Sequence, residues 1–321
     1  MTSLQRIPVA AVGTGNFGRH HARVYASLPD AELVAVVDSD RTRAREVAAE
    51  FGCEYRTAAE DLPARVRAAS VAVPTSHHAS VGSLLLRRGV DVLVEKPIAH
   101  DIEAASQLVE TAEANDRILQ VGHLERFNPA VQAAVAAATL PLFFEVHRMS
   151  PFSPRSLDID VVLDLMIHDI DIVRSLVDSR VKQVDASGLS VVSDRTDIAN
   201  ARIQFENGCV ANLTASRVST ERVRKLRFFQ PREYLSIDYI RRHGVRIGLD
   251  EANRPRVRPL AAGDGEPLRR ELKSFLKCVR ERRRPVVDGP DGLETLRLAL
   301  RIRNAIVEHS RLVSRTLAAS L

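Results

Sequence analysis

Apolar and polar positions along the first 125 residues follow two periods in alternation. Short runs rich in Val, Leu, Ile and Ala predict β-strands at residues 7–12, 31–38, 70–75, 91–97 and 118–123. Amphipathic stretches between these runs predict helices at 19–28, 41–51, 77–88 and 101–114. Because strands buried on both faces read as near-continuous apolar runs, this pattern predicts an α/β fold with a doubly wound parallel sheet.

The pattern changes after Pro129. An Ala-rich helix, the strand LFFEVHRMS and a helix around residues 160–173 precede the strand-like stretches VKQVDASGLSVV, IANARIQF, CVANLTASRV, VRKLRFFQ and EYLSIDYI. Turn signals such as ENG at 206–208 join consecutive strands, so this second sheet is expected to be mostly antiparallel. Helical periodicity returns at about 266–283 and 290–309.

Two domains follow from this change of pattern. Residues 1–125 form the α/β domain, and residues 126–321 form an α+β domain whose C-terminal helices can pack back on the first domain. A sheet with helices on one side leaves its other face to be covered, and a second subunit is the expected cover. We therefore expect a homodimer or homotetramer assembled through the second sheet.

Composition and charge narrow the classes of function. The chain is 45% hydrophobic, its 3 cysteines show no CxxC spacing, and its apolar runs fall short of the roughly 20 residues that cross a bilayer. We expect a cytoplasmic protein without a structural zinc, a disulfide framework or membrane insertion. The net charge is +5, but the arginines at 280 and 282–284 precede Pro285 and are expected to end a helix, so nucleic-acid binding is not expected.

A glycine-rich segment follows the first strand directly. In GTGNFG, residues 13–18, Gly13, Gly15 and Gly18 have the GxGxxG spacing between a strand and a helix. The first glycine permits a tight turn, the second lets the backbone approach a pyrophosphate, and the third allows close packing of helix on strand. The segment, with Asn16 and Phe17, is therefore the candidate pyrophosphate site of a Rossmann-type dinucleotide-binding domain.

An acid closes the next strand. Asp38 lies twenty residues after Gly18, where a carboxylate accepts hydrogen bonds from the adenosine ribose hydroxyls and repels a 2′-phosphate. This placement favours NAD as cofactor, while Arg41 and Arg43 nearby keep NADP as the alternative.

Two further strand ends carry polar residues where ligands bind in this class of sheet. Pro74 and Thr75 end one strand, and Glu95 and Lys96 end the next. Lysine is scarce in this Arg-rich chain, with residues at 96, 182, 225, 273 and 277, and Lys can be tuned to exchange a proton while Arg cannot. We expect Pro74, Thr75, Glu95 and Lys96 to contact the cofactor. His78 is also a candidate, although the histidine pairs 20–21 and 77–78 are expected to be mostly solvated.

The segment DIDVVLDLMIHDID at 160–173 carries a polar stripe. At about 100° per residue, Asp160, Asp164, His168 and Asp171 share one helical sector, whereas the apolar residues point elsewhere. Short acids and one imidazole suit a cavity or a partner better than bulk solvent. The alternative is that the acids are solvated or cap backbone N–H groups.

Together with VPTSHH, EKP and GHLERFNP, these segments resemble the glucose-fructose oxidoreductase and inositol dehydrogenase family, Gfo/Idh/MocA, over nearly the whole chain. The resemblance implies an N-terminal Rossmann domain for NAD or NADP and a C-terminal α/β domain that builds the sugar site and the subunit interface. It also implies that Lys96, of EKP, faces the reacting carbon, that His168 accepts the proton of the sugar hydroxyl, and that Asp164 positions imidazole or substrate. On this interpretation the stripe faces a cleft between the domains.

A subgroup of the family is closer still. ERFNP, residues 125–129, with the apolar LDLMIHDID resembles UDP-N-acetylglucosamine 3-dehydrogenases, which form a 3-keto sugar nucleotide for amination in lipid A precursor synthesis. A diphosphate needs cations, and the residues expected to bind the substrate beside Lys96, Asp164 and His168 are Arg126, Asn128, Arg148 and Arg155. A departure lies at 159–162, where many members have small residues and this chain has Ile-Asp-Val-Val.

Three alternatives remain from the residues alone. The first is an inositol, polyol or other sugar dehydrogenase of the same family. The second is a metal-dependent hydrolase or lyase with Asp164, His168 and Asp171 as ligands, against which no second His or Cys cluster supplies further ligands, so no metal is expected. The third is a non-catalytic NAD-responsive binding protein, which the glycine-rich domain alone also permits.

Overall fold

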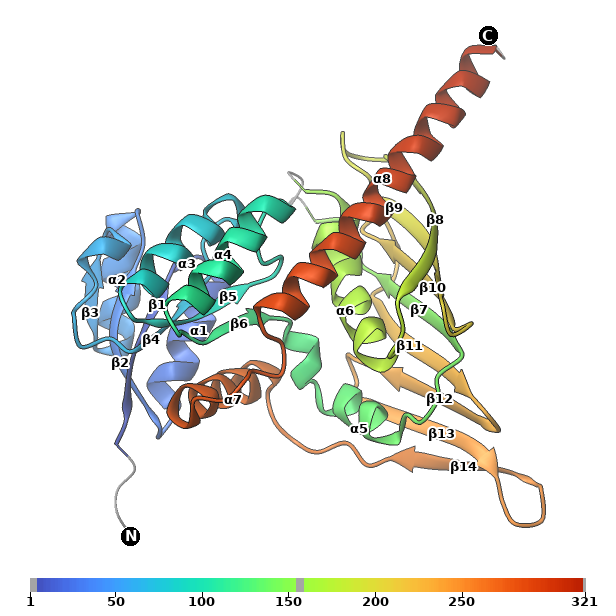
Figure 1. Ribbon diagram of the computed structural model, residues 1–321, viewed down its shortest axis with the longest axis horizontal. Coiled ribbons are helices and arrows are strands. Elements are labelled where there is room, and N and C mark those ends of the chain that lie inside the picture. Colours follow the sequence, from blue (N-terminus) through green and yellow to red (C-terminus); the bar gives the residue numbers. More distant parts are fainter. Residues whose placement is uncertain (1–4, 154–158, 320–321) are drawn as a thin grey trace. The chain divides into compact units, whose positions relative to one another are not determined.

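The structure, a computed structural model, describes residues 5–153 and 159–319 (Figure 1). It divides into two compact units, Met1–Phe127 with Gly265–Leu296, and Asn128–Asp264 with Arg297–Leu321. The change between units falls two residues after the expected boundary at 125, and the segment 265–296 returns to the first unit. Each unit is described in turn.

The first unit is built on a six-stranded sheet in the order β3-β2-β1-β4-β5-β6, in which every neighbouring pair is parallel. The strands are β1 Ile7–Val12, β2 Ala31–Val37, β3 Glu54–Arg56, β4 Ala68–Val71, β5 Asp91–Glu95 and β6 Leu119–Gly122. The helices are α1 Asn16–Ser27, α2 Arg41–Phe51, α3 His78–Arg87, α4 Ile102–Ala114 and α7 Pro267–Glu281, with 3-10 turns η1 Ala59–Asp61, η2 Thr75–His77 and η3 Leu124–Phe127. The predicted doubly wound parallel sheet is confirmed.

Two strands of this sheet differ from prediction. The strand expected at 70–75 is β4, Ala68–Val71, because the chain leaves the sheet before Pro74, which has no N–H to donate to a ladder, and enters η2. The short β3, only three residues long and half-exposed, was not predicted because it presents no apolar run. The first difference lies in the loop that follows β4, and the second is the edge strand of the sheet.

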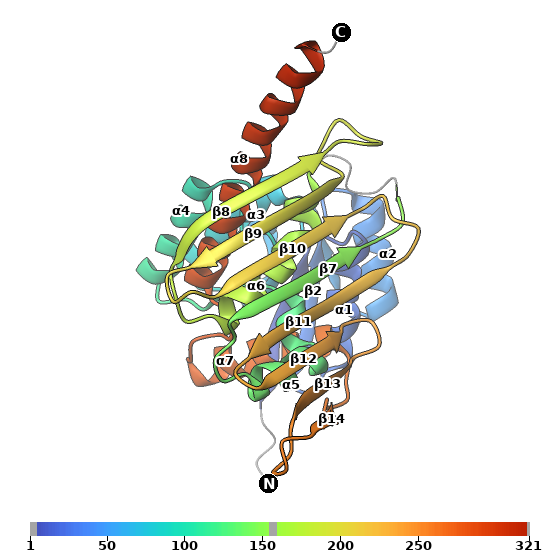
Figure 2. The ribbon, with the colours of Figure 1, turned by 90° about the vertical axis from the view of Figure 1, so that its right-hand side faces the viewer.

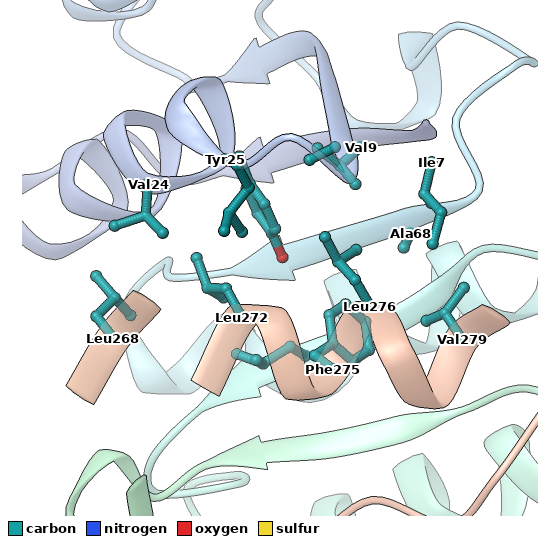
Figure 3. Packing of buried hydrophobic residues seen from close by; sticks show 13 residues of the cluster. Ile7, Val9, Val24, Tyr25, Ala68, Leu268, Leu272, Phe275, Leu276 and Val279 are labelled. Atoms are coloured by element: carbon teal, nitrogen blue, oxygen red, sulfur yellow. The ribbon is translucent and has the colours of Figure 1, made fainter. Parts of the chain in front are cut away.

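Helix α7 completes the core of the first unit although it lies far along the chain. Leu272, Phe275 and Leu276 pack with Tyr25 of α1 and Val9 of β1, as Figure 3 shows. Burying such side chains is worth about 1.5–3 kcal/mol each. The Tyr25 hydroxyl, inside this core, shares a hydrogen bond of 2.7 Å with Ser70, and burial raises the pKa of Tyr25 above its usual range.

The second unit contains an eight-stranded sheet in the order β14-β13-β12-β11-β7-β10-β9-β8. Its strands are β7 Phe143–Met149, β8 Val181–Leu189, β9 Ile198–Phe205, β10 Val210–Ser216, β11 Val223–Gln230, β12 Glu233–Asp238, β13 His243–Leu249 and β14 Pro255–Leu260. All pairs are antiparallel except β7 with β10, which confirms a mostly antiparallel sheet. The turn at 206–208 joins β9 to β10 as predicted.

The two faces of this sheet differ in composition. Phe144, Val146, Leu213 and Phe228 are buried on the face toward the helices of the unit. These helices are α5 Pro129–Ala137, α6 Ile167–Leu176 with the preceding π-helix η4 Val162–Met166, and the part of α8, Gly289–Ala319, that belongs to this unit. Figure 2 shows the opposite face of the sheet toward the viewer. On it the rings of Phe143, Phe229 and Tyr234 form a row, with centroids 5.8 and 4.9 Å apart.

Candidate functional site

The glycine-rich loop of the first unit leaves room where a pyrophosphate would approach. Gly13 has φ +86°, and a Cβ there would lie 2.6 Å from the carbonyl oxygen of Ala72. A Cβ on Gly18 would lie 1.7 Å from the carbonyl oxygen of Gly13, so neither position accepts a side chain. A Cβ on Gly15 would meet nothing within 4 Å. The space around each glycine is therefore compatible with the role that the spacing predicts, and pyrophosphate binding by this loop stays a prediction.

The start of α1 adds N–H groups to this space. The helix begins at Asn16 with Gly15 as N-cap, and no side chain caps it. The N–H groups of a first helical turn have no intrahelical acceptors and attract anions. Asn16 also lines a depression of about 520 Å³ with Thr14, Gly15 and Arg43. Phe17 is half-exposed, and its ring lies 5.2 Å from the ring of His21. The loop therefore fits the diphosphate of a dinucleotide.

Asp38 is fixed beside the loop. Its carboxylate accepts hydrogen bonds from Thr14 N at 2.8 Å and Thr14 Oγ1 at 2.9 Å on one oxygen, and from Asp40 N at 2.9 Å on the other. A carboxylate has about four acceptor sites, so capacity remains for a ribose hydroxyl. The nearby Arg43 is itself bound to acids, at 3.0 Å from Asp40 and 3.7 Å from Asp38. The negative charge of this corner is thus only partly offset by Arg43.

Glu95 and Lys96 leave the end of β5 in different environments. Glu95 is buried and lies 3.0 Å from His21 Nε2, and a Cβ on Gly122 would come within 2.6 Å of its Oε1. Lys96 is only partly buried. Glu95, expected to contact cofactor, therefore has its carboxylate inside the unit against α1. The Lys96–Pro97 peptide bond is cis.

The loop after β4 holds Pro74, which is exposed, and Thr75, which is partly exposed and begins η2. His78 follows at the start of α3 and is only 2% exposed, so the expectation that the histidine pairs are mostly solvated is wrong for it and for the fully buried His21. The ring of His78 lies 2.8 Å from the Pro97 carbonyl oxygen through Nδ1 and 2.9 Å from that of Val73 through Nε2. No feature of the sequence near His78 predicts that its ring lies against these two carbonyl oxygens.

The polar stripe of the second unit begins on a π-helix. Residues Val162–Met166 have π-helical geometry, with i→i+5 hydrogen bonding, and α6 continues from Ile167. The uniform spacing of 100° per residue was therefore wrong for this segment. Asp160 Oδ1 accepts from Val162 N at 2.9 Å and Leu163 N at 3.0 Å, so this acid caps the helix start, as the alternative interpretation proposed.

The remaining members of the stripe divide between partly exposed and buried. Asp164, inside the π-turn, and His168, in the first turn of α6, are partly exposed, whereas Asp171 is 1% exposed. Single-turn π-helices occur frequently at functional sites because they change which residues share a face. Of these three residues, Asp164 and His168 are thus the two whose side chains are not fully buried.

Arg148 is inside the second unit. Its Nε and Nη2 donate to the two carboxylate oxygens of Asp169 at 2.7 and 3.0 Å, and both side chains are 2% exposed. Its guanidinium carbon lies 5.1 Å from the centroid of the Tyr239 ring. Because Asp169 follows His168 directly, this pair anchors the helix that carries His168. Nothing in the spacing of Arg148 and Asp169 along the chain indicates that these two residues form an ion pair.

The other residues expected to bind substrate differ in how far their side chains are buried. Asn128 is buried, caps α5 by accepting from Ala130 N at 3.1 Å and donates to the Tyr239 carbonyl at 3.2 Å. Arg126 in η3 is partly exposed and donates to the Val286 carbonyl at 3.4 Å. Arg155 lies outside the described residues.

A second buried network, which sequence reasoning missed, borders the start of the same helix. Arg217 donates to Asp197 at 2.8 Å and to the carbonyl of Ile159 at 2.8 Å, one residue before the capping Asp160. Asp197 also accepts the backbone N–H groups of Val191, Val192 and Ser193. The network fixes the 190–196 loop and the backbone that leads into the π-helix.

Within 5–153 and 159–319 no three His, Cys, Asp or Glu side chains converge as a metal ion requires. Over the same residues no helix combines the length and apolarity that spanning a membrane demands.

Family models match both parts of the chain. Residues 7–123 match the model for the oxidoreductase family with an NAD-binding Rossmann fold, and residues 143–230 match the model for the GFO/IDH/MocA C-terminal domain.

Relatives and solved structures agree with these matches. The chain is 38% identical, over 92% of its length and 96% of the relative, to UDP-N-acetylglucosamine 3-dehydrogenase of Acidithiobacillus ferrooxidans. A solved structure of that enzyme has a TM-score of 0.89 at 36% identity, covering 94% of this chain and 98% of that one. scyllo-Inositol 2-dehydrogenase (NAD(+)) of Bacillus subtilis is 26% identical over 94% of both chains.

Proposed function

Because the chain belongs to the Gfo/Idh/MocA family of oxidoreductases with an NAD-binding Rossmann fold, we propose that it oxidises a secondary hydroxyl of a sugar nucleotide to a ketone. The enzyme is an NAD-dependent oxidoreductase that acts on CH–OH groups. The proposed substrate is UDP-N-acetylglucosamine, oxidised at C3, and the observation that carries this choice is the 38% identity to a UDP-N-acetylglucosamine 3-dehydrogenase over 92% of the chain. The 3-keto product suits later amination in lipid A precursor synthesis.

The proposed cofactor is NAD. The diphosphate would be held by the loop of Gly13, Gly15 and Gly18 and by the first turn of α1, and the ribose by Asp38. Proposed contacts from the strand ends are Pro74, Thr75 and Lys96. NAD, when bound, supplies the hydride acceptor. A 2′-phosphate would meet the Asp38 and Asp40 carboxylates, so NAD is preferred to NADP on charge.

Lys96 and His168 are the proposed proton-transfer residues, and Asp164 is proposed to orient substrate or imidazole. Oxidation of an alcohol releases the hydroxyl proton, and an amine or a neutral imidazole can accept it. Both side chains are partly exposed in their own units. His168→Ala is therefore expected to lower kcat by about 100-fold to 10,000-fold with NADH affinity unchanged. Lys96→Met should lower kcat over the same range and should weaken NADH binding by no more than about tenfold, because Lys96 is also a proposed cofactor contact.

Cations for the substrate diphosphate are proposed at Arg126 and Arg155. Arg148 and Asn128, expected from sequence to bind substrate, are buried with partners inside the second unit, and we propose that they position α6 and α5 instead. Replacing Arg126 should raise KM for a UDP-sugar more than it lowers kcat, since an exposed cation contributes binding to ground and transition states alike.

The test is a screen of UDP-sugars, free polyols and inositols for NADH formation, with NADP alongside NAD. Turnover of UDP-N-acetylglucosamine with kcat/KM at least about 100-fold above that for myo-inositol is the expected result, because the uridine diphosphate adds binding interactions. The second candidate is an inositol or polyol dehydrogenase, favoured by the 26% identity to a scyllo-inositol 2-dehydrogenase over 94% of the chain. Turnover of inositols alone would replace the first proposal with the second.

We also propose a homodimer or homotetramer, formed through the face of the second sheet that carries Phe143, Phe229 and Tyr234. A cytoplasmic location is proposed as well, with Cys53, Cys209 and Cys278 all present as free thiols.

A further inference from the structure

His78 connects two loops that leave neighbouring strands. β4 and β5 pair in parallel, with Val71 beside Val94, and the chain then diverges into the loop of Val73 and the loop of Pro97. One ring lies against a carbonyl oxygen of each loop, at 2.9 Å from Val73 and 2.8 Å from Pro97. The carbonyl of Pro97 is one residue beyond Lys96.

These contacts have a physical purpose beyond packing. Carbonyls that leave a sheet lose their ladder partners, and a buried carbonyl without a donor costs about 1–3 kcal/mol. His78 is 2% exposed, so water is a poor substitute for its ring. A hydrogen bond to the Pro97 carbonyl also limits rotation of the backbone from which the Lys96 side chain leaves.

We propose that His78 is a positioning residue for Lys96, and that its bond from Nδ1 to the Pro97 carbonyl carries this role. With the proton on Nδ1, Nε2 has only a lone pair and makes no hydrogen bond to the Val73 carbonyl oxygen, which lies 2.9 Å away. This inference rests on the proposed function, in which Lys96 handles a proton, and it replaces direct cofactor contact as the role of His78.

The charge state of the ring is consistent with this role. Burial lowers the pKa of His78, which the carbonyls of Pro97 and Val73 and the carboxylate of Glu95 oppose, and the charge of Lys96 lowers it further. At neutral pH the ring is therefore largely neutral and has one N–H to donate. The proposal assigns that proton to Nδ1.

Two isosteric substitutions separate the contacts. The amide nitrogen of Asn can occupy the place of Nδ1, and that of Gln the place of Nε2. His78→Asn therefore keeps a donor for the Pro97 carbonyl, whereas His78→Gln loses it and presents a donor to the Val73 carbonyl instead. His77→Gln, at the exposed neighbouring histidine, is the matched control. Each variant is compared with wild type for kcat, KM, NADH affinity and Tm.

The expected result is a split between the two variants. His78→Gln should lose about tenfold to 100-fold in kcat with NADH affinity within about threefold, since displacing a reacting group by about 1 Å costs up to about 100-fold. His78→Asn should keep kcat within about threefold of wild type. Equal losses in both variants, tracking a fall in Tm, would show a merely structural residue, and wild-type kcat in His78→Gln would also overturn the proposal.

Two measurements need no turnover, and the first of them needs no variant. In wild-type protein labelled with 15N-histidine, the proposal requires a proton on Nδ1 of His78, and an unprotonated Nδ1 contradicts it. With 13C-lysine, the chain's five lysines give a simple spectrum in which Lys96→Met identifies the Lys96 signal. That signal should titrate differently in His78→Gln and as wild type in His78→Asn, whereas identical titration in all three would end the proposal. Wild-type protein that turns over no UDP-sugar or polyol defeats the proposed function alone.

Discussion

At the scale of single residues, the pair of Arg148 and Asp169 shows why a buried charge must keep its partner. Each side chain is 2% exposed, and the guanidinium makes two hydrogen bonds to the carboxylate. Asp169→Asn removes a carboxylate that is paired with a buried cation, so we expect a loss of about 3–5 kcal/mol in the free energy of unfolding of the second unit. Urea unfolding followed by circular dichroism measures it.

The control for Asp169 is an exposed pair. Arg65 and Glu32 lie 2.5 Å apart with side chains 54% and 41% exposed. Glu32→Gln should change the free energy of unfolding by less than about 1 kcal/mol, because solvent screens such pairs. A loss for Asp169→Asn no larger than that of the control would remove the anchoring role of Arg148.

A second residue-scale prediction concerns acid stability. Burial opposes ionisation of Asp197, but hydrogen bonds from Ser193, from the backbone of Val192 and Val191, and from Arg217 outweigh it and hold the pKa of Asp197 well below its usual range. A carboxyl with a lower pKa in the folded state binds fewer protons there than in the unfolded chain. Its stabilisation is therefore complete above the unfolded pKa near 3.9 and is lost as pH falls from there toward the folded pKa.

Asp197→Asn removes this dependence. We expect the stability difference between wild type and Asp197→Asn to be largest at pH 6–7 and to shrink steadily below about pH 4. Denaturant midpoints of both proteins across that range measure the difference. A difference that stays constant down to pH 2.5 would show that the ionised form of Asp197 is not what stabilises the loop.

At the scale of elements, the π-helix Val162–Met166 sets the register of α6 relative to the capped start at Asp160. A π-turn contains one residue more than an α-turn, so deleting Leu165 should restore regular α-helix and rotate His168 by about 100° relative to that start. We expect kcat to fall by about 100-fold or more while far-ultraviolet circular dichroism stays close to wild type.

Leu165→Ala is the matched control for the deletion, because it shortens the same side chain and keeps the register. It should retain kcat within about tenfold. Comparable activity in the deletion variant and in Leu165→Ala would mean that the register of the π-turn has no catalytic importance.

The helices and strands also show how much of the secondary structure can be predicted from one sequence. Apolar periodicity predicted the first sheet except β3, most of the second sheet and α7, because these elements bury a face. It missed β14, Pro255–Leu260, whose residues are nearly all exposed, and β13 beside it. The π-turn was not predicted, because over only five residues the spacing of apolar positions in a π-helix differs little from the 3.6-residue period of an α-helix.

The candidate site was predictable where a recurring motif fixes the spacing of its residues. The intervals between Gly13, Gly18 and Asp38 belong to the dinucleotide-binding motif, so they predict a cofactor role although the residues that these side chains and glycines meet lie far along the chain. Pro97 lies 19 residues from His78 and Asp169 lies 21 residues from Arg148, and only tertiary packing brings each pair together. Spacing cannot reveal such pairs, and for this reason both residues were first interpreted as ligand contacts.

At the scale of the whole molecule, the property to be predicted is the number of subunits that associate. The outer face of the second sheet carries an aromatic row in which Phe229 is 39% exposed. We predict that sedimentation velocity at micromolar concentration gives a dimer or larger species, and that Phe229→Glu shifts it toward monomer, since a buried unpaired charge opposes association.

Arg87→Ala, at an exposed position of α3 in the first unit, controls for changes in surface charge, and it should leave the sedimentation coefficient unchanged. A wild-type monomer at this concentration, or a Phe229→Glu protein that sediments as wild type, would rule out assembly through this row.

The place of α7 in the chain affects biosynthesis. The apolar side chains of α1 and the first sheet that α7 covers, among them Val9 and Val24, have no cover until Pro267–Glu281 has been made. At about 5–20 residues per second, the intervening chain takes on the order of ten seconds to translate. During that interval a nascent chain ending near Phe127 exposes the apolar side chains that α7 later covers. We expect chaperones that act at the ribosome to bind this exposed surface. Gene fragments that stop there should yield inclusion bodies.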